Sequence, residues 1–114
     1  MKIHSNKIMI PSKCGIIIEE VDNILYVQSK INYCIIKMAD GKEFEFTKPL
    51  KTFEKNYPYN CFFRIHKTYL VNINHVTEIV LTNNSHVKLK TGCCLNIAVR
   101  RRSEIRKLFT IVEN

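Results

Sequence analysis

Short runs in which apolar and polar residues alternate, separated by turn residues, cover most of the chain. Such alternation is typical of β-strands that have one face on a core and the other in water. The strands predicted from these runs comprise residues 8–10, 15–18, 24–29, 33–38, 43–47, 63–66, 69–71, 76–80, 86–90 and 94–99. Asp40-Gly41, between two such runs, is a strong hairpin turn. The fold expected is therefore mainly β, an antiparallel meander of short strands with the character of an elongated β-sandwich.

The run at residues 24–29 differs from the others because both of its faces are apolar. Strict alternation places Ile24 and Tyr26 on one face and Leu25 and Val27 on the other. A strand at this position is expected to be apolar on both sides.

Helical spacing occurs at two places. Leu50, Phe53 and Tyr57 recur at helical intervals, and Pro58 then enforces a stop. A short internal helix here would pack Leu50 and Phe53 against the sheet. A C-terminal helix is also predicted, with an apolar face at i, i+3, i+4 and i+7 made of Ile105, Leu108, Phe109 and Val112.

The stretch Phe62–Asn72 contains a break in strand parity. Residues 63–66 alternate, whereas residues 69–71 are continuously apolar, which predicts a bend at residues 66–68 between two buried strand pieces. Such a bend would lift basic side chains off a rigid base. The alternative is a surface kink whose charged side chains are merely solvated.

Cationic residues also occur in two other segments, one after a predicted strand and one before the predicted last helix. The polar break at residues 29–32 would place Lys30, Asn32 and Tyr33 at one edge of the sheet. Three consecutive arginines, at positions 100–102, precede the last helix, and helical geometry prevents all three from facing one row of phosphates. For residues 29–33, the alternative is a plain hairpin loop with a half-buried tyrosine. For the three arginines, the alternative is a basic tail that aids solubility.

The stretch Phe62–Asn72, FFRIHKTYLVN, resembles the signature of the LytTR family of bacterial DNA-binding domains. Members carry a phenylalanine pair, an Arg-x-His, a basic or amide residue, a hydroxyl, an aromatic residue and an apolar-apolar-Asn ending. The further segments in the family's order and spacing are DNILYVQS (22–29), NY (32–33), DGKEFEF (40–46) and TGCCLNIAVRRR (91–102). The resemblance covers roughly residues 7–110. The chain departs from the family at Ala98 and Val99, where members often have a hydroxyl and an arginine.

The resemblance implies sequence-specific binding of double-stranded DNA by loops that enter the major groove, in a bacterial transcription regulator such as the output domain of a response regulator. The base-contacting positions expected are Lys67, Arg100, Tyr33 and Asn32. The phosphate-contacting positions expected are Lys30, Arg64, Thr68, Arg101 and Arg102. His66 is expected to brace the bend by a hydrogen bond. We expect tandem DNA repeats that hold two protein copies, and a separate signalling protein as a further partner.

The composition agrees with a nucleic-acid partner. The chain of 114 residues fits a single domain, residues 1–114, and its 18 Lys and Arg against 10 Asp and Glu give a net charge of +8 that attracts polyanions. No apolar run approaches the about 18 residues that span a membrane, and the N-terminus lacks a signal-peptide core, so we expect a cytoplasmic protein. The five cysteines, an odd number, are expected to be reduced thiols.

The sequence contains no catalytic constellation. Its four histidines are dispersed, its serines lie in no nucleophile motif, and no glycine-rich phosphate loop is present. We therefore expect no enzyme activity, no cofactor and no metal. Two other classes stay open, namely an adaptor whose exposed strands pair with a partner protein and a basic RNA-binding β domain. The phosphoacceptor domain that usually accompanies a LytTR module is not in this sequence, so a stand-alone regulator and a part of a longer regulator both stay open.

Overall fold

Antiparallel strands make up most of the chain in the computed structural model, which describes residues 6–56 and 61–109. The strands are β1 (Lys7–Ser12), β2 (Gly15–Glu20), β3 (Ile24–Ser29), β4 (Cys34–Met38), β5 (Glu43–Phe46), β6 (Phe62–His66), β7 (Tyr69–Asn72), β8 (Val76–Val80), β9 (His86–Leu89) and β10 (Cys94–Asn96). The helices of the described ranges are α1 (Leu50–Asn56), α2 (Arg102–Arg106) and the 3-10 helices η1 (Val21–Asn23), η2 (Ile73–His75) and η3 (Val99–Arg101). The mainly β fold with an internal and a C-terminal helix is confirmed.

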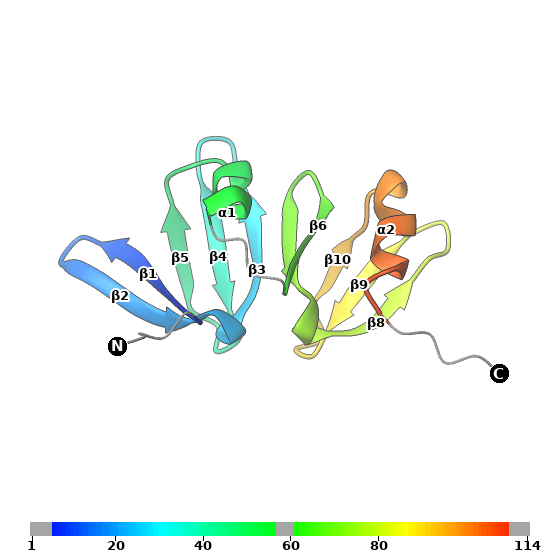
Figure 1. Ribbon diagram of the computed structural model, residues 1–114, viewed down its shortest axis with the longest axis horizontal. Helices are drawn as coiled ribbons and strands as arrows, with labels where there is room; N and C mark the ends of the chain where they lie inside the picture. The colour runs from blue at the N-terminus through cyan, green and yellow to red at the C-terminus, as the bar shows by residue number, and fades with distance from the viewer. Residues whose placement is uncertain (1–5, 57–60, 110–114) are drawn as a thin grey trace.

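The strands form three antiparallel sheets, two of which are a β1–β2 hairpin and a β10-β9-β8 sheet (Figure 1). The third has five strands in the order β5-β4-β3-β7-β6. Its pairings join consecutive strands, as expected for a meander, except that β7 pairs with β3. The chain after β5 passes through α1 to the other side of β3. As a consequence, the bend between β6 and β7 lies beside the loop between β3 and β4.

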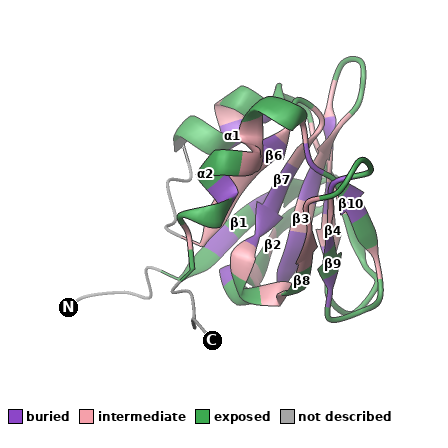
Figure 2. Ribbon diagram, turned by 90° about the vertical axis from the view of Figure 1, so that its right-hand side faces the viewer, coloured by how far each residue is buried: buried purple, intermediate pink, exposed green. Residues whose placement is uncertain are grey.

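The five-stranded sheet lies between the β1–β2 hairpin and the β10-β9-β8 sheet (Figure 1) and has apolar clusters on both faces. Buried residues lie along its inner strands (Figure 2). Buried side chains of β1, β3, β4, β7 and α1 form one cluster. Those of β3, β6, β7, β9, β10 and α2 form the other. β3 and β7 contribute to both clusters, so the two strands that lead into the β3–β4 loop and out of the β6–β7 bend are anchored from both sides.

Strand β3 has two apolar faces, but the division of its side chains predicted from strict alternation is wrong. Ile24 and Val27 lie in one cluster, whereas Leu25 lies in the other with Tyr26 packed against it. The pairing with β4 shifts in register between Ile24 and Tyr26, and such a β-bulge reverses the parity beyond it. Burial, with Cys93 alongside, raises the pKa of Tyr26 to about 12.

Helix α1 covers one face of the central sheet as predicted. Leu50 and Phe53 are both buried there. The ring of Phe53 meets Phe46 edge-on at a centroid distance of 5.4 Å and Phe62 at 6.0 Å, within the range that favours aromatic pairs. Tyr57, predicted to continue this helical face, lies outside the described residues.

Asn72, the last residue of the family signature, is fully buried at the end of β7. Its Nδ2 donates to the Ile24 carbonyl at 2.9 Å, and its Oδ1 accepts the Asn74 N–H at 3.0 Å, which caps η2. A buried amide of this kind is stable only while both bonds are made. Asn72 therefore joins β7 to the start of β3 and sets the turn into β8.

Replacing Asn72 by alanine should lower the free energy of unfolding by about 1–3 kcal/mol, because the Ile24 carbonyl loses its buried donor. Urea unfolding followed by circular dichroism measures this change. Asn74→Ala is the control, since Asn74 is exposed and takes part through its backbone N–H. Equal stability of Asn72→Ala and the unmodified chain would contradict the structural role.

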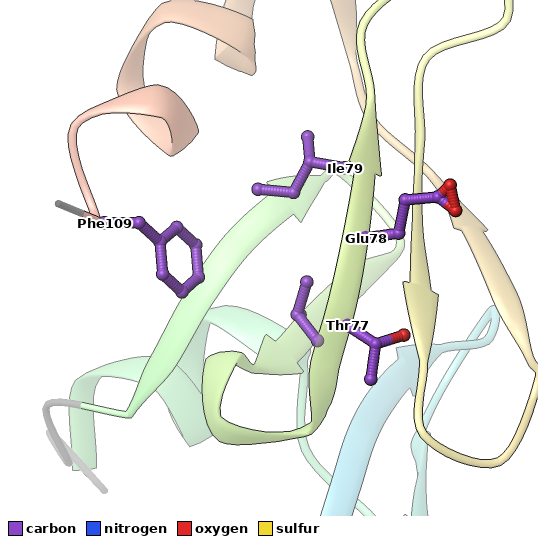
Figure 3. A pocket seen from close by; sticks show the side chains of 5 residues that line it. Thr77, Glu78, Ile79 and Phe109 are labelled. Carbon is purple, nitrogen blue, oxygen red and sulfur yellow. The ribbon is translucent and has the colours of Figure 1, made fainter. Parts of the chain in front are cut away.

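The C-terminal helix is shorter than its apolar spacing predicted. α2 ends at Arg106, and the i→i+3 bonds from Lys107 N–H to Glu104 O (3.1 Å) and from Leu108 N–H to Ile105 O (3.2 Å) tighten the chain into a turn. Ile105 is fully buried, but Phe109 is 40% exposed and faces Ile79 across an open groove beside β8 (Figure 3). Leu108 still packs against the cluster that contains Ile105, as the predicted apolar face requires, whereas Phe109 does not. Val112 lies outside the described residues.

Candidate nucleic-acid interface

Three loops lie along one edge of the molecule, at the top of Figure 1. They are the β3–β4 loop (residues 30–33), the β6–β7 turn (residues 67–68) and the segment that leads from β10 into η3 (residues 97–101). The Ser29 N–H donates to Thr68 O at 2.8 Å, and the Ala98 N–H donates to Ile65 O at 2.8 Å. The first bond joins the end of β3 to the β6–β7 turn, and the second joins the segment after β10 to β6 just before that turn. We call this surface the loop edge; it brings together the three loops that the sequence predicted to act jointly.

The β3–β4 loop is closed by a bond from the Lys30 N–H to Tyr33 O at 2.7 Å. Lys30, Ile31 and Asn32 are exposed, so their side chains are available to a partner. Tyr33 is half-buried, which fits both a strand aromatic and a ring that reaches past the sheet edge. The base contact predicted for it stays a prediction.

The β6–β7 bend contains the hydrogen bonds expected of His66. The pairing of the two strands shifts in register between Arg64 and His66, which starts the bend. His66 Nδ1 accepts the Thr68 N–H at 3.2 Å and lies 2.9 Å from Thr68 Oγ1. The Thr68 hydroxyl, predicted to contact phosphate, therefore lies next to the His66 ring. Lys67, between His66 and Thr68, is exposed.

Arg64 holds this bend from inside. Its Nε donates to His66 O at 2.8 Å, an Nη2 N–H donates to Lys67 O, and Nη1 lies 3.0 Å from the Glu54 carboxylate of α1. The Arg64 side chain is only 17% exposed. Three of its five N–H groups therefore point into the protein, and this geometry supports a positioning role ahead of the phosphate contact predicted for Arg64.

Replacing Arg64 by alanine should lower the free energy of unfolding by about 1–3 kcal/mol, because two turn carbonyls lose a charged donor. Glu54→Gln is the matched control, since it removes only a partly exposed ion pair that contributes about 0–1 kcal/mol. Urea unfolding measures both variants. If both variants lost the same stability, the ion pair rather than the turn would be the main contribution of Arg64.

The three consecutive arginines differ in their surroundings. Arg100 is exposed on η3. Arg101 pairs with Glu104 at 3.2 Å, and Arg102 donates from Nη2 to Thr82 O at 3.2 Å, which holds the β8–β9 turn. Ala98 stands at the N-cap of η3 and makes no side-chain bond there. Arg100 is therefore the arginine of the three that points most freely outward.

Residues that the sequence prediction missed also lie at the loop edge. Arg102 lines a polar recess together with His66, Asn83, Asn84 and Asn96. Asn83 and Asn84 lie far from η3 along the chain, so the sequence does not reveal this proximity. Ile31 was missed because an isoleucine in a polar break gives no periodic pattern.

Acidic side chains gather at the opposite end of the strands. Asp22 in η1, Asp40 in the β4–β5 turn and Glu43 at the start of β5 are exposed; Asp40 lies 3.6 Å from Lys42, and Glu43 pairs with Lys37. The Ala39 N–H donates to Asn23 O at 2.7 Å and joins the turn to η1. Two of these carboxylates are thus paired with lysines, whereas the loop edge carries the exposed Lys30, Lys67 and Arg100.

The sequence model of the LytTr DNA-binding domain family matches residues 15–110, which include all three loops. The chain belongs to the LytTR family. LytTR domains are DNA-binding domains of transcription regulators, and a domain of this kind has DNA as its partner. The family is not a class of enzymes.

Curated relatives of this LytTR chain are regulators. Two proteins named Sensory transduction protein LytT, from Bacillus cereus and Bacillus anthracis, are 27% identical over 111 residues and 28% identical over 108 residues. Transcriptional regulatory protein BtsR of Salmonella typhi is 30% identical over 83 residues. The matches cover 96%, 93% and 73% of this chain and 45%, 44% and 34% of the relatives. The chain therefore spans less than half the length of each.

A solved LytTr DNA-binding domain from Bacillus cereus has the same fold. It superposes with a TM-score of 0.77 over 90% of this chain and 95% of that chain, at 20% sequence identity. The arrangement of strands on which the LytTR loop edge rests is thus shared with a solved member of the family.

Three further features of the described residues concern membrane helices, metal ions and cysteines. No helix in the described part of the LytTR chain is long and apolar enough to cross a membrane. Within residues 6–56 and 61–109, His, Cys, Asp and Glu side chains form no group of three that could hold a metal ion. All five cysteines are free, and burial raises the pKa of Cys34 and of Cys61, which disfavours their thiolates.

Proposed function

We propose that this chain binds double-stranded DNA sequence-specifically, through loops of the loop edge that enter the major groove, as the DNA-binding module of a bacterial transcription regulator. The observation that supports this most is the shared position of three cation-bearing loops at one edge of the molecule, whose central sheet is anchored from both faces. A rigid base keeps the loop separations fixed, which a periodic ligand such as duplex DNA requires.

Lys67 and Arg100 are the proposed base readers. Both are exposed at the loop edge, and the bond between Ala98 and Ile65 places their loops side by side. Arginine can donate to guanine O6 and N7 at once, and lysine donates to the same atoms with less geometric constraint. Asn32 and Tyr33 on the third loop would complete the base contacts, since an amide matches adenine N6 and N7.

The proposed phosphate contacts come from the residues around these readers. Lys30 is exposed and needs only to reach one phosphate oxygen. Arg101 and Arg102 would bind phosphates with the N–H groups that are not used in their bonds to Glu104 and to Thr82 O. Arg64 and Thr68 would act in the same way, after first holding the bend.

The assembly of the protein with its DNA site and other proteins is proposed from the resemblance to the LytTR family. The DNA site would consist of tandem repeats that bind two protein copies, and the duplex would bend at a cost of a few kcal/mol that the added contacts offset. A separate signalling protein would control the regulator, which would work in the cytoplasm. Residues 1–114 would act as one LytTR domain.

Selection from a random-sequence duplex pool tests this function. We expect one recurring sequence, called the cognate duplex below, to be enriched and to bind more tightly than random duplex, single-stranded DNA or RNA at the same salt concentration. Tighter binding to RNA would favour an RNA-binding β domain, and the absence of any nucleic-acid preference would favour a protein-interaction adaptor.

A further inference from the structure

The two most exposed large hydrophobic side chains of the described residues both lie at the loop edge. Ile31, in the β3–β4 loop, is 95% exposed, and Val99, beside Arg100, is 73% exposed. The other exposed large hydrophobics of the described part are Met9, Ile16, Ile18 and Phe109, at 57%, 58%, 52% and 40%. Single exposed apolar residues are common on protein surfaces, but here the most extreme ones stand among the cations that face DNA.

The geometry of the loop directs Ile31 outward. The bond from the Lys30 N–H to Tyr33 O closes the β3–β4 pair, so residues 31 and 32 alone form the tip of the loop. A β-branched side chain has few rotamers and gives a turn corner no packing energy. Ile31 is thus a stiff, water-exposed apolar group between an exposed lysine and an exposed asparagine, at the tip of a loop anchored by Ser29 to Thr68.

Duplex DNA offers one apolar group in the major groove, the C5-methyl of thymine. Lysine and asparagine cannot recognise this methyl group, whereas an aliphatic side chain contacts it and thereby distinguishes thymine from cytosine. We propose that Ile31 contacts the C5-methyl of one thymine in the cognate duplex and makes the β3–β4 loop a thymine reader. This assignment rests on the proposed function.

Replacement of single thymines by deoxyuridine tests the assignment, because it removes the methyl group and keeps the base pair. With the unmodified chain, replacement at one thymine of the cognate duplex should weaken binding by about fourfold, the effect of one buried methyl. With Ile31→Ala, the same replacement should have no effect, and binding to the thymine duplex should already be weakened by about fourfold or more. Fluorescence anisotropy at fixed salt measures both.

Val99→Ala is the matched control, since it shortens the other exposed aliphatic side chain of the loop edge. It should leave the response at the Ile31-dependent thymine intact. The assignment is overturned if no thymine responds in the unmodified chain, if the response persists in Ile31→Ala, or if Val99→Ala also abolishes it. Failure of the proposed function would instead appear as equal binding of the unmodified chain to cognate and random duplex.

Discussion

Lys67→Ala and Arg100→Ala should each weaken binding to the cognate duplex by about 5- to 150-fold, and weaken binding to random duplex far less. The size follows from the about 1–3 kcal/mol that a good base contact adds to discrimination. Both side chains are exposed on loops tied together by the bond between Ala98 and Ile65, so both can reach one stretch of duplex. On random duplex neither side chain has a matching base, and only its charge is lost.

Lys30→Ala provides the comparison for these two variants. Lys30 is exposed in the β3–β4 loop and is assigned to a phosphate, which is the same in every sequence. Its removal should weaken binding to both duplexes by a similar factor. Anisotropy titrations of the three variants on both duplexes measure the ratio of dissociation constants. The same fractional loss on both duplexes for all three variants would contradict the assignment of base readers.

Affinity for the cognate duplex should fall by about 500-fold between about 50 and 200 mM salt. Each phosphate contact releases condensed counterions, and about five contacts give a slope of about −4.5 in log affinity against log salt. The cations proposed to contact phosphates, Lys30, Arg64, Arg101 and Arg102, together with the nearby charges of Lys67 and Arg100, would neutralise about this number of phosphates.

The salt dependence can be divided among residues. Lys30→Ala should make the slope shallower by about 0.9, the contribution of one phosphate contact. Lys51→Ala on α1 is the control; Lys51 is exposed and lies outside the loop edge, so its removal should leave the slope unchanged. Binding that is indifferent to salt would contradict the electrostatic basis of the interface.

The strands and the loop edge could be predicted from the sequence because both depend on local pattern. Alternation and turn residues identified β1 to β10, and the loss of parity after His66 identified the bend. The bulge in β3 was not predictable, since it arises from the pairing with β4 and leaves no mark in the local alternation. The early end of α2 was missed for a related reason, because Leu108 and Phe109 keep helical spacing while the chain tightens into a turn.

The roles of the arginines were harder to predict than their presence. Arg64 and Arg100 are equivalent in sequence, as cations next to apolar residues, yet one donates to two carbonyls of the bend and the other is exposed. This difference arises from the tertiary structure, because the positions of α1 and β6 in the fold bring Glu54 close to the bend. In this chain, Arg64 of the signature segment is therefore part of the scaffold that holds the bend.

The net charge of +8 and the exposed cations of the loop edge bear on how fast the complex forms. A polyanion attracts such a chain over about a Debye length and favours an approach with the loop edge toward the duplex. Encounters in this orientation should therefore become more frequent. Association should then be quicker than the usual orientational limit allows, with the advantage lost as ions shorten the reach of the field.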